Sequence, residues 1–170
     1  MYRLRLIEQG DAELIRQARN SDAVRPFMCG QEIIEAPQHM AWFTKKMAVL
    51  AHEPYCLFLR GDAPLGVVGI SQYDEEHGIG EWGFYLFAPD APRGAGTAML
   101  VAFCEYVLEH TRMKALSARV KASNEKSLHL HEKLGFARVQ EEDGIVHFLM
   151  MREGWQRERQ RFAPLPAEGA

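Results

Sequence analysis

The hydrophobic pattern changes period in the middle of the chain, and this change limits the fold more than any other feature. Three runs rich in aromatic and branched residues lie between short polar links, as is typical of neighbouring antiparallel strands. These runs are residues 55–60, 65–70 and 81–87. Segments with helical spacing precede and follow them, and helices are predicted from Asp11, from Pro37 and after Gly96. The chain therefore combines an antiparallel sheet with helices.

Strands and one further helix are predicted in the rest of the chain. The strands are residues 2–7, 115–121, 136–140 and 145–151, and the helix is 124–134. The helix from Pro37 is expected to bury an apolar stripe made of Met40, Phe43, Met47 and Leu50. With 170 residues, of which 47% are hydrophobic, all these elements fit one core. We expect a single domain at residues 1–152 and a charged tail at 153–170, partly helical and then frayed.

Composition and charge exclude several classes of function. A net charge of -3 lacks the basic excess of a nucleic-acid-binding protein, and no apolar run approaches the ~20 residues that span a bilayer. The first residues contain no signal-peptide pattern, so a cytoplasmic protein is expected. Cys29, Cys56 and Cys104 are widely spaced, which argues against disulfides and a CxxC metal site. They are expected to be buried or half-buried thiols.

The segment Arg93-Gly94-Ala95-Gly96-Thr97-Ala98 follows a predicted strand and opens a predicted helix. Small residues allow a ligand to approach the backbone closely, and the free N–H groups at a helix start bind phosphate oxygens. The segment lacks the Lys-Ser/Thr ending of a Walker A loop, and the strand before it belongs to an antiparallel meander. It fits either a phosphate cradle or a glycine turn that binds no ligand.

A second group of polar residues lies on the helix predicted at 124–134. Asn124, Ser127 and His131 share one face because their spacing matches the helical period. His129 points in another direction, so the two histidines do not form a natural metal pair. This face either contacts a ligand, or Asn124 is only a helix N-cap and His131 a surface or boundary histidine.

Together, the two segments resemble motifs of the GCN5-related N-acetyltransferase (GNAT) superfamily. Arg93-x-x-Gly96-x-Ala98 resembles its acyl-CoA pyrophosphate motif, and the stretch from Asn124 to Phe136 resembles the helix that follows. The order of strands and helices over residues 2–151 is also similar. The resemblance implies an α/β (α+β) fold in a single domain, with a central, mostly antiparallel mixed sheet of about seven strands flanked by helices. It also implies acetyl-CoA as the cofactor, with no metal.

The resemblance places acetyl-CoA in a cleft between the strand that ends near Leu86 and the strand that starts near Ala115. Backbone N–H groups after Arg93 are expected to bind the pyrophosphate, and strand peptide groups to pair with the pantetheine arm. The expected cofactor-binding residues are Tyr85, Leu86, Phe87, Arg93, Gly94, Ala95, Gly96, Thr97, Ala98, Asn124 and Ser127.

Two catalytic residues are expected on the same basis. Glu81 is expected to accept the proton of the attacking amine through water, although a strand-edge carboxylate paired with a cation is the alternative. His131 stands where much of the superfamily has tyrosine, and an imidazole with an ordinary pKa of about 6.5 can donate a proton near neutrality. His131 is therefore expected to protonate the sulfur. The transfer is expected to be direct, in a ternary complex.

A narrower resemblance is to the PseH-like acetyltransferases, which act on a nucleotide-linked 4-amino sugar in pseudaminic acid biosynthesis. The residues that carry it are Arg25-x-Phe27-Met28, His39-x-x-Trp42-Phe43 and the run from Glu81 to Gly94. It implies a UDP-linked amino sugar as the acceptor. Arg25 is then expected on the diphosphate, and a wall for the base and sugar is expected from Phe27, Met28, His39 and Trp42.

Other acceptors, and one different class of function, fit the same sequence. The acceptor is alternatively a protein N-terminus of the ribosomal type, a polyamine or another small amine, and a cleft lined with carboxylates favours these. Loss of the usual tyrosine also fits a non-catalytic acyl-CoA-binding module. A homodimer is one expectation for the oligomeric state.

Overall fold

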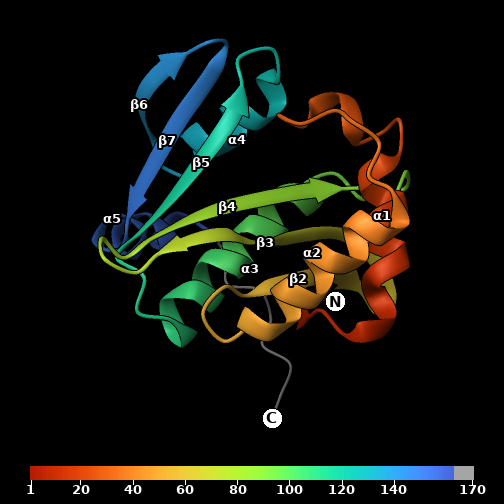
Figure 1. The fold of residues 1–170 in the computed structure, drawn as a ribbon. Helices are drawn as coiled ribbons and strands as arrows, with labels where there is room; N and C mark the ends of the chain where they lie inside the picture. The colour runs from red at the N-terminus through yellow and green to blue at the C-terminus, as the bar shows by residue number, and fades with distance from the viewer. Residues whose placement is uncertain (163–170) are drawn as a thin grey trace.

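In a computed structural model, which describes residues 1–162, one mixed sheet of seven strands has the order β1-β2-β3-β4-β5-β7-β6 (Figure 1). The strands are β1 (Tyr2–Leu6), β2 (Tyr55–Arg60), β3 (Ala63–Asp74), β4 (Ile79–Leu86), β5 (Ala115–Lys121), β6 (Ala137–Glu142) and β7 (Ile145–Met151). The helices are α1 (Ala12–Asn20), α2 (Ala36–Val49), α3 (Ala95–His110), α4 (Glu125–Lys133) and α5 (Arg152–Glu158), with short 3-10 helices η1 (Gln9–Asp11), η2 (Arg25–Phe27) and η3 (Arg159–Arg161). Neighbouring strands pair antiparallel except β4 and β5, which are parallel. The predicted fold class is confirmed.

The strand boundaries differ from the predicted ones mainly where the sequence becomes polar. The strands predicted at 55–60, 115–121 and 145–151 are confirmed. β3 is longer than the predicted run, because its polar end from Gln72 to Asp74 still pairs with β4. β6 spans Ala137–Glu142 instead of 136–140, and all of its residues are exposed. A strand without a buried face has no hydrophobic alternation to mark its end.

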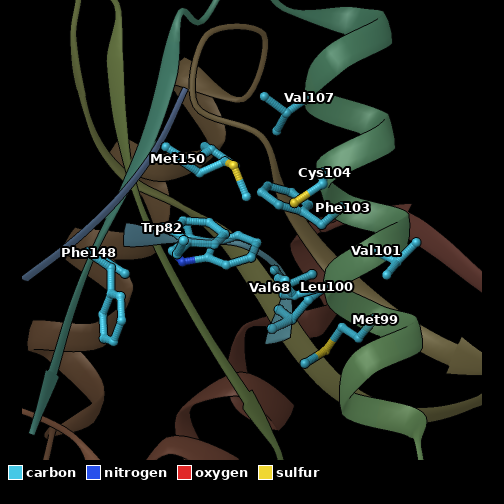
Figure 2. Close-up of a cluster of buried hydrophobic side chains, with 14 of the residues drawn as sticks. Val68, Trp82, Met99, Leu100, Val101, Phe103, Cys104, Val107, Phe148 and Met150 are labelled. Carbon is cyan, nitrogen blue, oxygen red and sulfur yellow. The ribbon is translucent and has the colours of Figure 1, made fainter. Parts of the chain in front are cut away.

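The sheet buries a different set of side chains on each face, as the period of two along β2 shows. Cys56 and Phe58 point to the face that packs against α3, in the cluster around Trp82 (Figure 2). Leu57 and Leu59 point to the opposite face, which α1 and α2 cover. Successive side chains of a strand alternate between faces, so a continuous apolar run such as this one marks a strand buried on both sides.

The buried side of α2 differs from the predicted apolar stripe. Phe43 is fully buried as predicted, but Met40 is 40% exposed. His39 and Lys46 are buried instead, beside Phe43. The helix is rotated about its axis relative to the predicted orientation, so that polar side chains lie on its buried side. The spacing of the apolar residues alone cannot predict this burial.

Two of the three cysteines are buried thiols, as predicted. Cys56 of β2 and Cys104 of α3 lie in the core between the sheet and α3, and burial raises the pKa of Cys56 to about 12. The prediction is wrong for Cys29, which is exposed in the loop after η2. That loop runs over the surface, where few neighbours can cover its side chains.

The segment after β7 packs on the core that faces α3. Trp155 of α5 is 3% exposed, and its indole N–H donates to Glu105 Oε1 at 2.7 Å. Phe162 stacks on the Trp155 ring with centroids 5.8 Å apart. The frayed end predicted for the tail lies at residues 163–170, outside the described residues. Among the helices described, none combines the length and apolar composition needed to cross a bilayer.

Candidate active site

A cleft opens where β4 and β5 separate. Their parallel pairing is limited to three residue pairs, from Ile79 with Ala115 to Glu81 with Ser117. Beyond Glu81 the two strands diverge (Figure 1). The cleft has a volume of about 540 Å³, in the range of small-molecule sites, and its walls come from β4, β5, α3, α4 and the loop after α1. The cleft therefore lies between the two strands that the resemblance predicted would border it.

The part of β4 beyond Glu81 presents open backbone to the cleft. On the side of β5, the described strands offer no ladder partner to the residues from Trp82 to Leu86. An extended ligand can pair with such an edge. Tyr85 and Leu86 line the cleft, whereas the N–H of Phe87 already donates to the carbonyl of Leu65 at 3.0 Å. The predicted backbone contact of Phe87 therefore lacks a free donor.

The start of α3 has free N–H groups where the sequence predicted a phosphate cradle. Gly94 precedes the helix with a φ of 89°, a conformation that side chains with a Cβ disfavour. The N–H groups of Ala95 and Ala98 donate to the carbonyls of Pro92 and Gly94. Those of Gly96 and Thr97 have no acceptor within the part of the chain that the structure describes.

Only one of the cradle residues lies on the wall of the cleft itself. Gly96 lines it, while Arg93 and Gly94 are exposed beside it. A second cation lies close to the helix start, because Lys133 Nζ is 3.4 Å from Thr97 Oγ1. A phosphate group at this helix end would therefore meet N–H donors and two positive side chains.

Asn124 and Ser127 line the cleft from the first turn of α4, as their shared face predicted. The side chain of Asn124 is also an N-cap, since its Oδ1 accepts the N–H of Ser127 at 3.2 Å. Asn124 is therefore a helix N-cap through its side-chain oxygen, as one of the two alternatives expected. Its amide NH₂ donors remain available, because the cap uses only the carbonyl oxygen.

His131 lines the cleft but is 1% exposed, and both of its ring nitrogens have partners. The indole N–H of Trp82 donates to Nε2 at 3.1 Å, and an indole nitrogen can only donate. Nε2 therefore carries a lone pair, and the neutral ring has its proton on Nδ1. That proton is donated to the carbonyl of Ser127, 2.7 Å away.

This environment argues against the predicted acid role of His131. Burial lowers the pKa of His131 to about 4, and the hydrogen bond to the Ser127 carbonyl offsets only part of that effect. The ring also stacks on Phe148, with centroids 4.8 Å apart. Near neutral pH the ring is neutral and its one proton points into the helix backbone. In this structure the contacts of His131 hold the Trp82 ring, and neither ring nitrogen has a proton free for a ligand in the cleft.

Glu81 lies at the last position where β4 pairs with β5, and it forms an ion pair. Arg119 of β5 donates from Nη2 to Oε1 at 3.0 Å and from Nε to Oε2 at 3.1 Å. The Ser71 hydroxyl donates to the carbonyl oxygen of Glu81 at 3.0 Å and lies 3.4 Å from Oε1. The carboxylate faces the cleft as predicted. It is also paired with a cation, as the alternative interpretation of Glu81 expected.

The residues predicted for the acceptor wall are separated in the structure. Phe27 and Met28 line the cleft, from η2 and the loop after it. Arg25 does not line it, since its guanidinium donates to the carbonyl of Gln31 and contacts Asp22.

His39 and Trp42 lie on α2, away from the cleft lining. His39 is 3% exposed, and its ring packs 5.3 Å from that of Trp42. The expectation of a wall that includes these two residues is therefore corrected. α2 covers the sheet face opposite α3, and its buried side packs on the core there.

Three cations on the cleft wall were missed by the sequence analysis. Arg19 comes from the end of α1, Arg119 from β5 and Lys126 from the start of α4. Of the three, only Arg119 carries a recognisable signal, because residue 119 shares a strand face with residue 117, opposite Glu81. Arg19 and Lys126 come from elements whose approach to the cleft depends on the tertiary fold.

Comparison with known proteins agrees with the fold. The family described as an acetyltransferase (GNAT) domain matches residues 2–137. Among curated proteins, no sequence matches the chain. The residues described contain no group of His, Cys, Asp or Glu side chains arranged to hold a metal ion.

Several solved structures are similar over nearly the whole chain. FdhC, described as a nucleotide-linked sugar GNAT, has a TM-score of 0.80 at 20% identity over 94% of this chain and 92% of its own. Spermidine N-acetyltransferase from Vibrio cholerae, in complex with CoA and spermine, has a TM-score of 0.80 at 17% identity over 91% and 98%. Campylobacter jejuni N-acetyltransferase PseH has a TM-score of 0.67 at 20% identity over 89% and 98%. At these sequence identities, the similarity shows a shared fold.

Proposed function

The chain belongs to the acetyltransferase (GNAT) domain family, and we propose that this acetyl-CoA-dependent N-acetyltransferase acts on the amine of an anionic small molecule. A nucleotide-linked amino sugar, of the UDP-linked 4-amino type, is the acceptor that we propose. Direct transfer in a ternary complex requires both substrates in one cleft.

The charge of the cleft is the observation that carries the proposal. Among its described lining residues, Arg19, Arg119 and Lys126 are cations and Glu81 is the one carboxylate. Arg119 already neutralises Glu81. A polyamine or a free amino terminus is cationic and would gain more from unpaired carboxylates, whereas a diphosphate gains from free cations.

The donor side of the cleft fits acetyl-CoA, which supplies the acetyl group as a thioester. We propose that the free N–H groups of Gly96 and Thr97 bind the pyrophosphate, assisted by Arg93 and Lys133. The free NH₂ of Asn124 and the open edge of β4 are proposed to bind the pantetheine arm. In this proposal the cofactor contacts are mainly backbone groups.

An amine attacks a thioester only as the neutral base, so its proton needs an acceptor. We propose Glu81, acting through a water molecule. Arg119 and Ser71 both contact Oε1, but Oε2 accepts only from Arg119 Nε and retains a lone pair for a further hydrogen bond. His131 fixes the Trp82 ring at the cleft wall and leaves the sulfur to be protonated by water.

CoA thiol release from acetyl-CoA by the purified protein tests the proposal. The acceptors are a UDP-linked 4-amino sugar, the same amino sugar without its nucleotide, spermidine and a ribosomal N-terminal peptide, with a blank that lacks acceptor. We expect release with the nucleotide sugar to exceed release with all the others. Faster release with spermidine or the peptide would replace the acceptor, and acetyl-CoA binding without release on any amine would favour a binding module. Light scattering on the same preparation tests the proposed homodimer.

A further inference from the structure

Lys46 of α2 is a buried cation that does not itself line the cleft. Its side chain is 4% exposed. Nζ pairs with the carboxylate of Glu53, donates to the carbonyl of Ile70 at 2.8 Å and lies 3.5 Å from the carbonyl of Ser71. The second oxygen of Glu53 accepts the N–H of Tyr73 at 3.0 Å. The pair therefore binds the backbone of β3 on both sides of Gln72.

These contacts lie at the point where β3 loses one of its neighbours. β2 begins at Tyr55, opposite Gly69, so no strand of the described residues pairs with β3 on that side beyond Ile70. The register between β3 and β4 also shifts between Ile70 and Gln72, which makes Ser71 the extra residue of a bulge. Backbone groups of β3 beyond the start of β2 need other partners, and Lys46 and Glu53 provide them for the carbonyl of Ile70 and the N–H of Tyr73, on either side of the bulge.

The bulge residue connects this buried pair to the cleft. Ser71 lines the cleft, and its hydroxyl contacts both the carbonyl and the carboxylate of Glu81. Glu81 in turn holds Arg119 across the gap between β4 and β5. A continuous set of contacts thus runs from Glu53 and Lys46, through Ser71, to Glu81.

We propose that Lys46 and Glu53 are positioning residues that fix the β3 bulge, and with it the direction in which Glu81 points into the cleft. A buried ion pair costs desolvation energy, and an apolar pair of similar volume is often as stable. The pair therefore does more for geometry than for stability. This inference rests on the proposed role of Glu81 as proton acceptor.

A second ion pair, which has a purely structural role, provides the matched control. Asp11 pairs with Arg5 at 2.9 Å and accepts the backbone N–H of Glu8 at 2.7 Å, as Glu53 pairs with Lys46 and accepts the N–H of Tyr73. Arg5 and Asp11 have no residue on the cleft wall among their partners. Arg5→Met therefore removes a pair with the same kind of backbone contact, but with a half-buried cation, and does not touch the bulge.

The experiment compares Lys46→Met with Arg5→Met in steady-state acetyl transfer, below the unfolding temperature of both and with the best amine found for the wild type. We expect Lys46→Met to lower kcat roughly tenfold and to change its pH profile, with the KM for acetyl-CoA within about twofold, because a misplaced catalytic group affects the chemical step. Arg5→Met should retain the wild-type kcat and profile. Adding Ser71→Ala to Lys46→Met should cause no further loss, since both act through one bulge.

Wild-type kcat and pH profile in folded Lys46→Met, or losses that multiply in the double variant, would overturn the inference. If Lys46→Met does not fold, Glu53→Gln gives the same test, because its amide keeps the shape but loses the charge. Glu81→Gln separates this inference from the one on which it rests. An unchanged kcat in Glu81→Gln removes the role of Glu81, whereas a loss in Glu81→Gln without one in Lys46→Met removes only the positioning role.

Discussion

The two halves of the cleft are built in different ways. The half proposed to bind acetyl-CoA, called the donor half, consists largely of backbone groups at the start of α3 and the open edge of β4, together with the capped first turn of α4. The half proposed to bind the amine, called the acceptor half, consists of side chains from separate elements, such as Arg19, Phe27 and Met28. A backbone site depends on local conformation, whereas a side-chain site depends on which elements meet. Short motifs can therefore identify the first half much better than the second.

The largest expected effect is a loss of stability at low pH, and it depends on the buried His131 ring in the donor half. His131 is neutral in the folded protein because burial lowers its pKa from 6.5 to about 4. The unfolded chain binds this proton at higher pH, so the stabilisation is complete above pH 6.5 and is lost as the pH falls toward 4. A shift of this size corresponds to roughly 3 kcal/mol.

Urea unfolding of the wild type and of His131→Gln, at pH 7.5 and at pH 4.5, measures this contribution. The glutamine oxygen can still accept the Trp82 N–H but does not titrate, so the variant should lose less stability on acidification. Equal losses in both proteins would show that His131 carries no proton-linked stability. The comparison between variants cancels the carboxylates that titrate in the same range.

A bulky side chain at the helix start tests the backbone site. A Cβ at Gly96 would lie 3.6 Å from Leu86 and 3.7 Å from Leu130, which are ordinary contacts, so Gly96→Val should fold. Its branches would cover the free N–H groups, and we expect CoA affinity to fall by roughly tenfold or more. Calorimetric titration of CoA measures it, with Gly10→Ala as the control in open space. Unchanged affinity of Gly96→Val would place the pyrophosphate elsewhere.

Arg19→Met tests the acceptor half. We expect the KM for the nucleotide-linked amino sugar to rise roughly fivefold, since one charge-assisted contact is lost. The KM for the same amino sugar without its nucleotide should change by less than about twofold. Equal increases for both acceptors would mean that Arg19 acts only through its hydrogen bond to the carbonyl of Gly30.

The smallest effects are expected from residues that the sequence placed in the acceptor wall and the structure does not. Arg25→Ala and Trp42→Ala should change kcat/KM for the nucleotide sugar by less than about twofold, because neither side chain lines the cleft. A selective loss with the nucleotide sugar in either variant would restore that residue to the acceptor site. Thermal unfolding of each variant controls for misfolding.

The parts of the site that could be predicted from the sequence are those set by neighbouring residues. Gly94 and Gly96 lie at the start of the helix that follows β4, and Asn124 caps the next helix, so their backbone positions follow from local geometry. Glu81 was expected at the cleft from the family resemblance, which placed its strand beside the cofactor. Its pairing with Arg119 required two strands to meet across 38 positions of the chain.

The sequence by itself determined the fold class, most element boundaries and the glycine-rich helix start, because hydrophobic period, glycine conformation and helix caps act over a few residues. Only the tertiary structure decided the state of His131, the cations on the cleft wall and the β3 bulge beside Lys46. Each of these depends on desolvation or on contacts between distant segments. A histidine on a helix face is an acid when water reaches it and a neutral acceptor when Trp82 and Phe148 enclose it.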